Sequence, residues 1–327
     1  MIFYGNIHMK YSNFLFSVAA FLFVFNSYSA QENVVRVATF NIRLGSGDKG
    51  TWNAWPERKG DVLRLIREMK LDVYGLQEVQ PKQLEFLKKH LSEFRFIGDY
   101  RNADRVSGEA SPVCFRRNRF SLQSSGTFWL SEKPDVPGLK GWGAAYPRVC
   151  SYVILSDKQT GERFCFANTH TDHKSELARE HGIRLVLERM DKIAAGASIV
   201  LVGDHNCLEI DKPSLLVTKQ LKDALYASES SPKGAWRTYN GWRWREKEIE
   251  ISEAMKLPRD IRNSSESKNG ELSFIERCGG SRIDYIYVSP KIRVVDYKTV
   301  DSPRLGRTTY PSDHFPVVAT LIIPCNL

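Results

Sequence analysis

The sequence lacks several patterns that mark special classes of protein. Its 327 residues contain six cysteines, and no two of them form a Cys-x-x-Cys pair or show zinc-type spacing. There is no internal repeat, and glycine and proline are present at ordinary levels, with 22 and 14 residues. Collagen-like, wholly disordered and small disulfide-scaffold proteins are therefore excluded. Cys114, Cys150 and Cys165 lie in apolar, strand-like runs, where we expect buried free thiols.

Acidic residues are fewer than basic ones. Lys plus Arg number 47 and Asp plus Glu 38, so the formal net charge is 47 − 38 = +9. A basic balance favours anionic partners such as nucleic acid, phosphoesters or a membrane surface, and it does not choose among them.

No apolar run is long enough to cross a bilayer, which takes about 20 residues of helix. The longest run, residues 14–25, follows Lys10 and precedes the small residues of Ser27-Tyr28-Ser29-Ala30. This order is typical of a cleaved signal peptide. We therefore expect residues 1–30 to be removed, no transmembrane anchor, and an exported mature chain, periplasmic or secreted, that spans residues 31–327. Loss of Lys10 leaves a net charge of +8.

Alternating and helical patterns in the mature chain predict about ten strands and three clear helices. Residues 34–42 and 72–79 are typical of strands, Pro56 opens a helix between them, and residues 175–195 carry the longest helical pattern. The order is mixed, so we expect an α/β or α+β sandwich in one domain. In residues 243–268, 13 of 26 side chains are charged. We expect a charged surface insertion there, with an active-site lid as the alternative.

Polar residues recur where predicted strands end. Asn41, Glu78, Asp204 with Asn206, and Asp313 with His314 each follow such a segment. Any one of them alone is typical of a turn or helix cap. Gathered at one rim of a sheet, however, several carboxylates are costly unless a cation neutralises them.

Six motifs in order resemble the endonuclease/exonuclease/phosphatase superfamily, whose members include deoxyribonuclease I and deadenylase-like enzymes. The motifs are Thr-Phe-Asn-Ile at 39–42, Leu-Gln-Glu-Val at 76–79, Asn-Thr-His at 168–170, Gly-Asp-His-Asn at 203–206, Arg-Ile-Asp-Tyr-Ile at 282–286 and Ser-Asp-His at 312–314. The segments at 128–132 and 141–148 are similar to a secreted bacterial branch related to the deadenylase-like members. The resemblance implies a deoxyribonuclease I-like fold, a four-layer α/β sandwich of two packed mixed β-sheets flanked by helices.

The resemblance also implies a divalent-metal site. Glu78 would bind Mg²⁺, or Mn²⁺ in its place, with Asn41 and Asp313 assisting, because these ions prefer hard oxygen ligands. Asp204 would orient or deprotonate the attacking water, and Asn206 would hold a phosphate oxygen. His205, between them, is assigned no role.

Two histidines complete the expected catalytic set. His314 would contact the phosphate as a cationic donor or act as the base, with Asp284 fixing its ring. The choice between these two roles stays open. His170 would protonate the leaving group, with Glu109 as its carboxylate partner.

Besides Asn206, three further residues are candidates for substrate binding. Arg148 suits a bidentate phosphate clamp, although an ion pair between the sheets is an equal alternative. Trp142 and Trp236 lie in loop-like sequence, where an indole ring would contact the leaving group; core packing is the competing interpretation.

Taken together, the sequence predicts an exported, Mg²⁺-dependent phosphoester hydrolase in which water attacks a phosphodiester in line, as in a nuclease. The first alternative is a phosphomonoesterase or phospholipase C-type enzyme acting on inositol phosphate, sugar phosphate or phospholipid head groups. A catalytically silent binding module is the second, and the presence of every motif residue argues against it. We expect a phosphoester partner, nucleic acid among the candidates, and a monomer.

Overall fold

The computed structural model describes Met1, residues 32–267 and residues 271–324. Apart from Met1, the predicted signal peptide at 1–30 lies outside the described residues. Glu32–Leu327 forms one compact unit. Among the described residues, no helix has the length and apolar character needed to cross a membrane.

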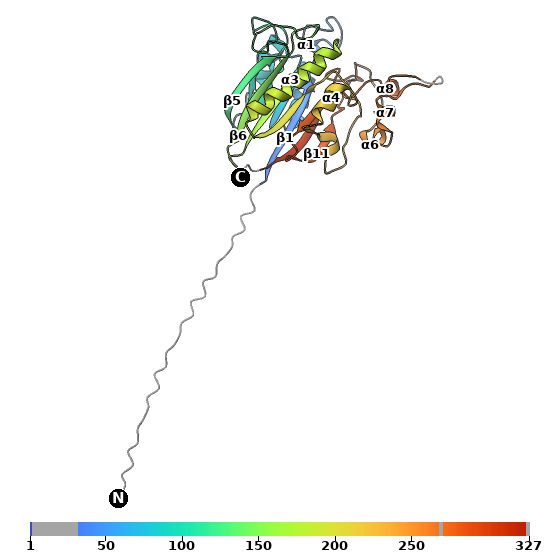
Figure 1. Cartoon of the computed structure of the whole chain (residues 1–327). Coiled ribbons are helices and arrows are strands. Elements are labelled where there is room, and N and C mark those ends of the chain that lie inside the picture. The colour runs from blue at the N-terminus through green and yellow to red at the C-terminus, as the bar shows by residue number, and fades with distance from the viewer. Residues whose placement is uncertain (2–31, 268–270, 325–327) are drawn as a thin grey trace. The chain divides into compact units, whose positions relative to one another are not determined.

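Two six-stranded sheets form the centre of this unit (Figure 1). The first has the strand order β11-β12-β1-β2-β4-β3, with bounds β1 Asn33–Asn41, β2 Val73–Gln77, β3 Phe94–Ile97, β4 Val113–Arg116, β11 Arg293–Thr299 and β12 Val317–Ile323. The second has the order β5-β6-β7-β8-β10-β9, with bounds β5 Phe120–Trp129, β6 Val149–Asp157, β7 Arg163–His170, β8 Ser198–Asp204, β9 Lys222–Asp223 and β10 Asp284–Val288.

Three long helices and several short ones accompany the sheets. They are α1 Trp55–Glu68, α2 Pro81–His90, α3 Glu176–Ala194, α4 Lys212–Val217, α5 Ala224–Ala227, α6 Ile251–Ala254, α7 Arg259–Arg262 and α8 Phe274–Cys278. The sequence correctly places proline in the first turn of α1, where the missing N–H costs nothing. Ser175 caps α3, its Oγ accepting from the Ala178 N–H at 3.1 Å.

The alternation of side chains along each strand separates the core into layers. In β1, Val35 and Val37 pack between the sheets, whereas Ala38 and Phe40 face α1 and α2. In the second sheet, Val200 and Val202 face inward and Leu201 packs against α3. The result is the predicted four-layer sandwich of helices, sheet, sheet and helices. The five described cysteines are buried and free, as expected.

The charged segment 243–268 is more than a solvated loop. It contains α6 and α7, which lie with α8 at one side of the sandwich (Figure 1). Ile251 of α6 belongs to the core between the sheets. Arg262 Nε lies 2.9 Å and Asn263 Nδ2 lies 2.7 Å from Oε1 of the buried Glu209. Part of the segment's charge therefore serves an internal ion pair.

Candidate active site

The two parallel strand pairs bring the predicted residues to one edge of the sandwich. In the pair β1–β2, Asn41 is opposite Gln77, which places Glu78 beside it. In β7–β8, His170 is opposite Asp204, and the antiparallel β10 begins with Asp284 opposite the same residue. Carboxyl ends of parallel strands meet at a common edge, as in other α/β sheets.

A cavity of about 600 Å³ opens at this edge. The predicted residues that line it are Glu78, Glu109, Arg148, His170, Asp204, Asn206, Asp313 and His314. Asn41 and Asp284 are fully buried, and each hydrogen-bonds to a lining residue. The structure therefore gathers the motif residues, which lie far apart in the sequence, around one space.

Local backbone geometry at this edge is unusual. Arg43, Glu78 and Asn206 have φ values of +56°, +62° and +46°, in the left-handed region. Such conformations cost about 1–3 kcal/mol each for residues other than glycine and concentrate at functional sites. Gly203 has φ +154°, and a Cβ there would lie 2.0 Å from the carbonyl oxygen of Thr169. Only glycine therefore fits before Asp204.

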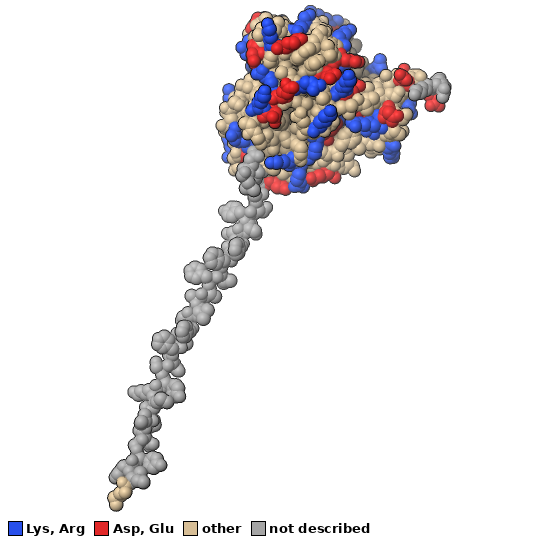
Figure 2. All heavy atoms as spheres, in the orientation of Figure 1, with Lys and Arg blue, Asp and Glu red and all other residues tan. Residues whose placement is uncertain are grey.

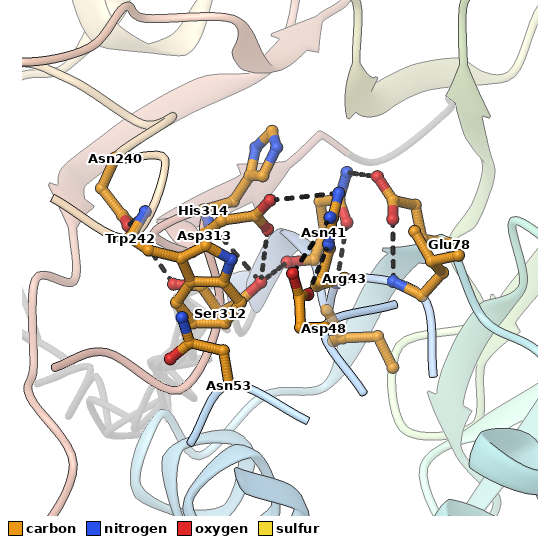
Figure 3. Close-up of polar contacts among 12 residues, drawn as sticks. Asn41, Arg43, Asp48, Asn53, Glu78, Asn240, Trp242, Ser312, Asp313 and His314 are labelled. Atoms are coloured by element: carbon orange, nitrogen blue, oxygen red, sulfur yellow. Dashed lines mark hydrogen bonds and ion pairs between the residues drawn. The ribbon is translucent and has the colours of Figure 1, made fainter. Parts of the chain in front are cut away.

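Asn41 connects two of the carboxylates that line the cavity. Its Nδ2 donates to Glu78 Oε1 at 3.0 Å and to Asp204 Oδ2 at 2.9 Å, while its Oδ1 accepts from the Arg43 N–H at 3.0 Å. Figure 3 shows Asn41 and Arg43 between Glu78 and Asp313. Asn41 therefore bridges the two carboxylates, and because its Oδ1 keeps a second lone pair, the expected metal contact stays a prediction.

His314 and Asp284 form a buried ion pair. His314 Nδ1 lies 2.8 Å from Asp284 Oδ2, and Nε2 lies 3.7 Å from Asp204 Oδ2. Burial alone would lower the pKa of His314, but the Asp284 and Asp204 carboxylates outweigh it and raise that pKa well above its usual value. Burial and the charge of Asp284 raise the pKa of Asp204 to about 7. Of the two roles predicted for His314, this charge state favours the cationic donor; the role itself stays a prediction.

Ligand atoms of Asp204, Asp284 and His314 lie within 4.8 Å of one another, a spacing that a metal ion could bridge. However, Nδ1 of His314 already faces a carboxylate at 2.8 Å, and a cationic imidazole has no lone pair for a metal. We therefore interpret this group as a hydrogen-bonded ion pair.

His170 is held as a neutral ring. Burial, followed by the charges of Arg148 and Arg101, lowers the pKa of His170 well below its usual value. Its Nε2 lies 2.9 Å from Asn206 Nδ2. The expected partner, Glu109, is elsewhere: its Oε2 accepts from Arg101 NH1 at 2.7 Å, eight residues away, because a tight loop brings the two together. Among the described residues, Glu109 therefore pairs with Arg101 and makes no hydrogen bond to His170, although both residues line the cavity.

The three predicted substrate-binding residues have different positions. Arg148 lines the cavity and is 5% exposed. Trp142 is not among the lining residues, and its indole stacks on His181 of α3 at 5.2 Å. Trp236 is 2% exposed and packs in the core, 5.9 Å from the Arg282 guanidinium. The prediction for Trp236 is wrong because its loop-like sequence hid a buried cation–π contact.

Sequence reasoning missed several residues that line the cavity: Arg43, Arg101, Tyr146 and Tyr239. Arg43 follows the first motif by one residue, and its NH1 lies 3.5 Å from Asp313 Oδ2. Its position beside Asn41 was an available signal. The other three come from loops without a recurring pattern.

The chain belongs to the Endonuclease/Exonuclease/phosphatase family, whose model matches residues 38–314. It is similar to a family protein from Bacteroides thetaiotaomicron, with 29% identity, TM-score 0.75 and coverage of 90% of this chain and 100% of that one. A mannosyl-6-phosphatase from Bacteroides thetaiotaomicron VPI-5482 has 29% identity and TM-score 0.72, with coverage of 88% and 100%.

Matches to curated proteins are partial. Tyrosyl-DNA phosphodiesterase 2 from Bos taurus is 24% identical over 152 residues, which are 46% of this chain and 37% of that protein. The curated relatives are matched over 19% to 59% of their own length. The family and the fold place this chain among the phosphoesterases.

The side chains present fit the divalent cation that this family implies. Glu78 and Asp313 line the same cavity and offer hard carboxylate oxygens. Burial raises the pKa of Asp313, and the neighbouring charge of Glu78 adds to this effect, while His314 and Arg43 oppose it. A cation at this position would relieve the repulsion between the two carboxylates.

Proposed function

We propose that the protein is an exported, divalent-metal-dependent phosphoester hydrolase that directs water in line onto phosphorus. The observation that carries the proposal is the convergence of the family's motif residues on one cavity, with a base and a cationic donor side by side. Asp204 and His314 line this cavity, and His314 Nε2 lies 3.7 Å from the Asp204 carboxylate.

Each side chain has a role that follows from its protonation state. With a pKa of about 7, Asp204 accepts a proton from water near neutral pH. Cationic His314 donates to a phosphate oxygen and offsets charge that develops there, while Asp284 keeps its ring oriented. Asn206 Nδ2 lies 2.9 Å from His170 Nε2 and donates to the Thr171 carbonyl oxygen at 3.1 Å, so it would hold a second phosphate oxygen only by exchanging one of these partners. Glu78 and Asp313 would hold Mg²⁺ or Mn²⁺, which would supply Lewis-acid stabilisation of the phosphoryl charge.

The preferred substrate is a small phosphomonoester. A relative that aligns over nearly the whole chain is described as a mannosyl-6-phosphatase. In addition, on the face shown in Figure 2 positive and negative side chains are interspersed, without the continuous basic stripe that a long polynucleotide favours. A nuclease-like phosphodiesterase is the second candidate, favoured by the partial match to tyrosyl-DNA phosphodiesterase 2 and by the net charge of +9.

The test is a hydrolysis panel on the purified mature chain, with p-nitrophenyl phosphate, bis-p-nitrophenyl phosphate and plasmid DNA, each with Mg²⁺ and with EDTA. We expect metal-dependent release from the monoester. Asp204→Asn should lower kcat by about 10²-fold or more. Asp135→Asn, which removes a side chain that is 77% exposed, is the matched control. Absence of hydrolysis on all three substrates with Mg²⁺ would overturn the proposal.

A further inference from the structure

One end of the cavity is formed by residues that the catalytic roles above leave unused. We name it the Tyr146 subsite, and it consists of Arg101, Glu109, Tyr146, Arg148 and His173, all of which line the cavity. Tyr146 is 50% exposed although it lies beside buried charged groups. Its ring is nearly parallel to that of His173, with centroids 6.1 Å apart and an interplanar angle of 17°. The Arg101 guanidinium carbon lies 4.7 Å from the same ring.

A polar pair borders this aromatic ring. Arg101 NH1 donates to Glu109 Oε2 at 2.7 Å, and the two side chains are 12% and 13% exposed. That bond uses one nitrogen and one oxygen of groups that carry five N–H donors and two acceptor oxygens. The pair therefore retains the capacity to donate and to accept at the same place.

A buried donor in this subsite lacks a hydrogen-bond partner. Arg148 is 5% exposed; its NH2 lies 3.0 Å from His173 Nδ1, and its Nε lies 3.6 Å from Asp172 Oδ2. Among the described residues, Nε makes no hydrogen bond. Because Nε is itself buried beside the Asp172 carboxylate, what Arg148 contributes to the subsite is a fixed positive charge in the cavity wall.

We infer that the Tyr146 subsite binds the leaving group and selects a polyhydroxylated ring, so that the preferred substrate is a sugar phosphate. This inference rests on the proposed function. A sugar ring has an apolar C–H face, which suits the exposed Tyr146 ring, and an edge of hydroxyls that both donate and accept. The donors of Arg101 and Arg148 and the carboxylate of Glu109 match such an edge.

Other leaving groups fit this subsite less well. Arg101 and Arg148 would attract the further phosphates of a polynucleotide, but phosphate oxygens only accept, so the Glu109 carboxylate would stay without a donor from the ligand. An acyl or alkyl group would bury the Arg101–Glu109 pair against a surface that cannot hydrogen-bond, at a cost in desolvation. A sugar satisfies the aromatic ring and the polar pair together.

The experiment compares two phosphomonoesters, mannose 6-phosphate and n-butyl phosphate, which lacks both ring and hydroxyls. Selectivity is the ratio of their kcat/KM values, measured by phosphate release with Mg²⁺. We expect the unchanged protein to prefer mannose 6-phosphate by about tenfold or more. Tyr146→Ala and Glu109→Gln should each lower this ratio by about tenfold, mainly through KM for the sugar phosphate.

Two variants serve as matched controls. Asp99→Asn removes another carboxylate that binds an arginine in the same loop, Arg105, and Trp52→Ala removes an aromatic ring that is 67% exposed. Neither Asp99 nor Trp52 lines the cavity, so both variants should keep the selectivity ratio.

The possible outcomes separate this inference from the proposed function. Hydrolysis of n-butyl or p-nitrophenyl phosphate without a preference for the sugar phosphate would overturn the sugar subsite and leave the phosphoesterase standing. An equal loss of kcat/KM on both esters in Tyr146→Ala would also refute the sugar subsite, because Tyr146 would then act on the phosphate group that the two esters share. Faster hydrolysis of a dinucleotide than of any sugar phosphate would assign the subsite to nucleic acid. No hydrolysis of any ester would overturn both proposals.

Discussion

His205 gives the chain a specific sensitivity to acid. Its imidazole is 0% exposed, and neither ring nitrogen has a hydrogen-bond partner among the described residues. The ring lies 5.5 Å from the Tyr285 ring and 5.4 Å from the Tyr287 ring, measured between centroids. Burial lowers the pKa of His205 from 6.5 to about 3 in the folded chain. Folding therefore requires this side chain to stay neutral.

The sign of the effect follows from this shift. Between about pH 6.5 and pH 3 the unfolded chain binds a proton at this position and the folded chain does not, so stability falls as the pH falls. Between pH 7 and pH 5 this single group should remove about 2 kcal/mol of unfolding free energy. His205→Phe keeps an aromatic ring and removes the titration. Between pH 7 and pH 5, the unfolding free energy of the variant should therefore fall by about 2 kcal/mol less than that of the parent chain.

The assay is urea unfolding of the parent chain and of His205→Phe at pH 7 and at pH 5. The result is the loss of unfolding free energy between these pH values in the parent chain minus the same loss in the variant. His205→Leu repeats the test for the case that the larger phenyl ring overpacks the site. His90→Phe is the control, because His90 is only partly buried and its Nδ1 lies 2.8 Å from the Phe86 carbonyl oxygen. Equal losses of stability in the parent chain, His205→Phe and His205→Leu would refute the reasoning.

Three further predictions concern the metal, the ion pair and the mature terminus. Glu78→Gln should raise the Mg²⁺ concentration needed for half-maximal activity by about tenfold or more with unchanged melting, because one anionic oxygen is lost; an unaltered Mg²⁺ titration would contradict the metal assignment. His314→Ala and Asp284→Asn should each impair kcat/KM, and together cost far less than the product of the single effects; independent multiplication with unchanged melting would argue against a functional pair. Mass spectrometry of exported protein should find a chain that begins at Ala30 or Gln31, and an intact Met1 terminus would exclude cleavage.

The residues that could be predicted from sequence are those at strand ends. Asn41, Glu78, Asp204 and Asp284 follow or begin strands with clear alternation, and the sheet register then brings them together. Their convergence is a direct consequence of strand order, which explains why the four-layer fold was predicted correctly and why the motif residues lie around one cavity.

The errors come from loops, whose course depends on tertiary contacts. Glu109 binds Arg101 because the loop between β3 and β4 closes on itself, and local sequence does not reveal this. Tyr146 was missed because only folding brings it beside Arg101 and His173. Trp236 was misjudged because charged guanidinium groups, normally exposed, cover its buried ring.

The ion pair at Glu209 makes the charged segment 243–268 hard to shorten. Deletion of this stretch would remove Arg262 and Asn263. The buried Glu209 would keep the Tyr226 hydroxyl and the Arg282 guanidinium at 3.4 Å, a group already bound at 2.7 Å to Asp223. Breaking a buried pair in this way costs about 3–5 kcal/mol. Because Glu209 follows Asp204 and Asn206 in one short connection, a deletion at the periphery would disturb the centre. The segment supplies an intramolecular counter-ion, so a shortened chain would need a replacement cation or a Glu209→Gln substitution.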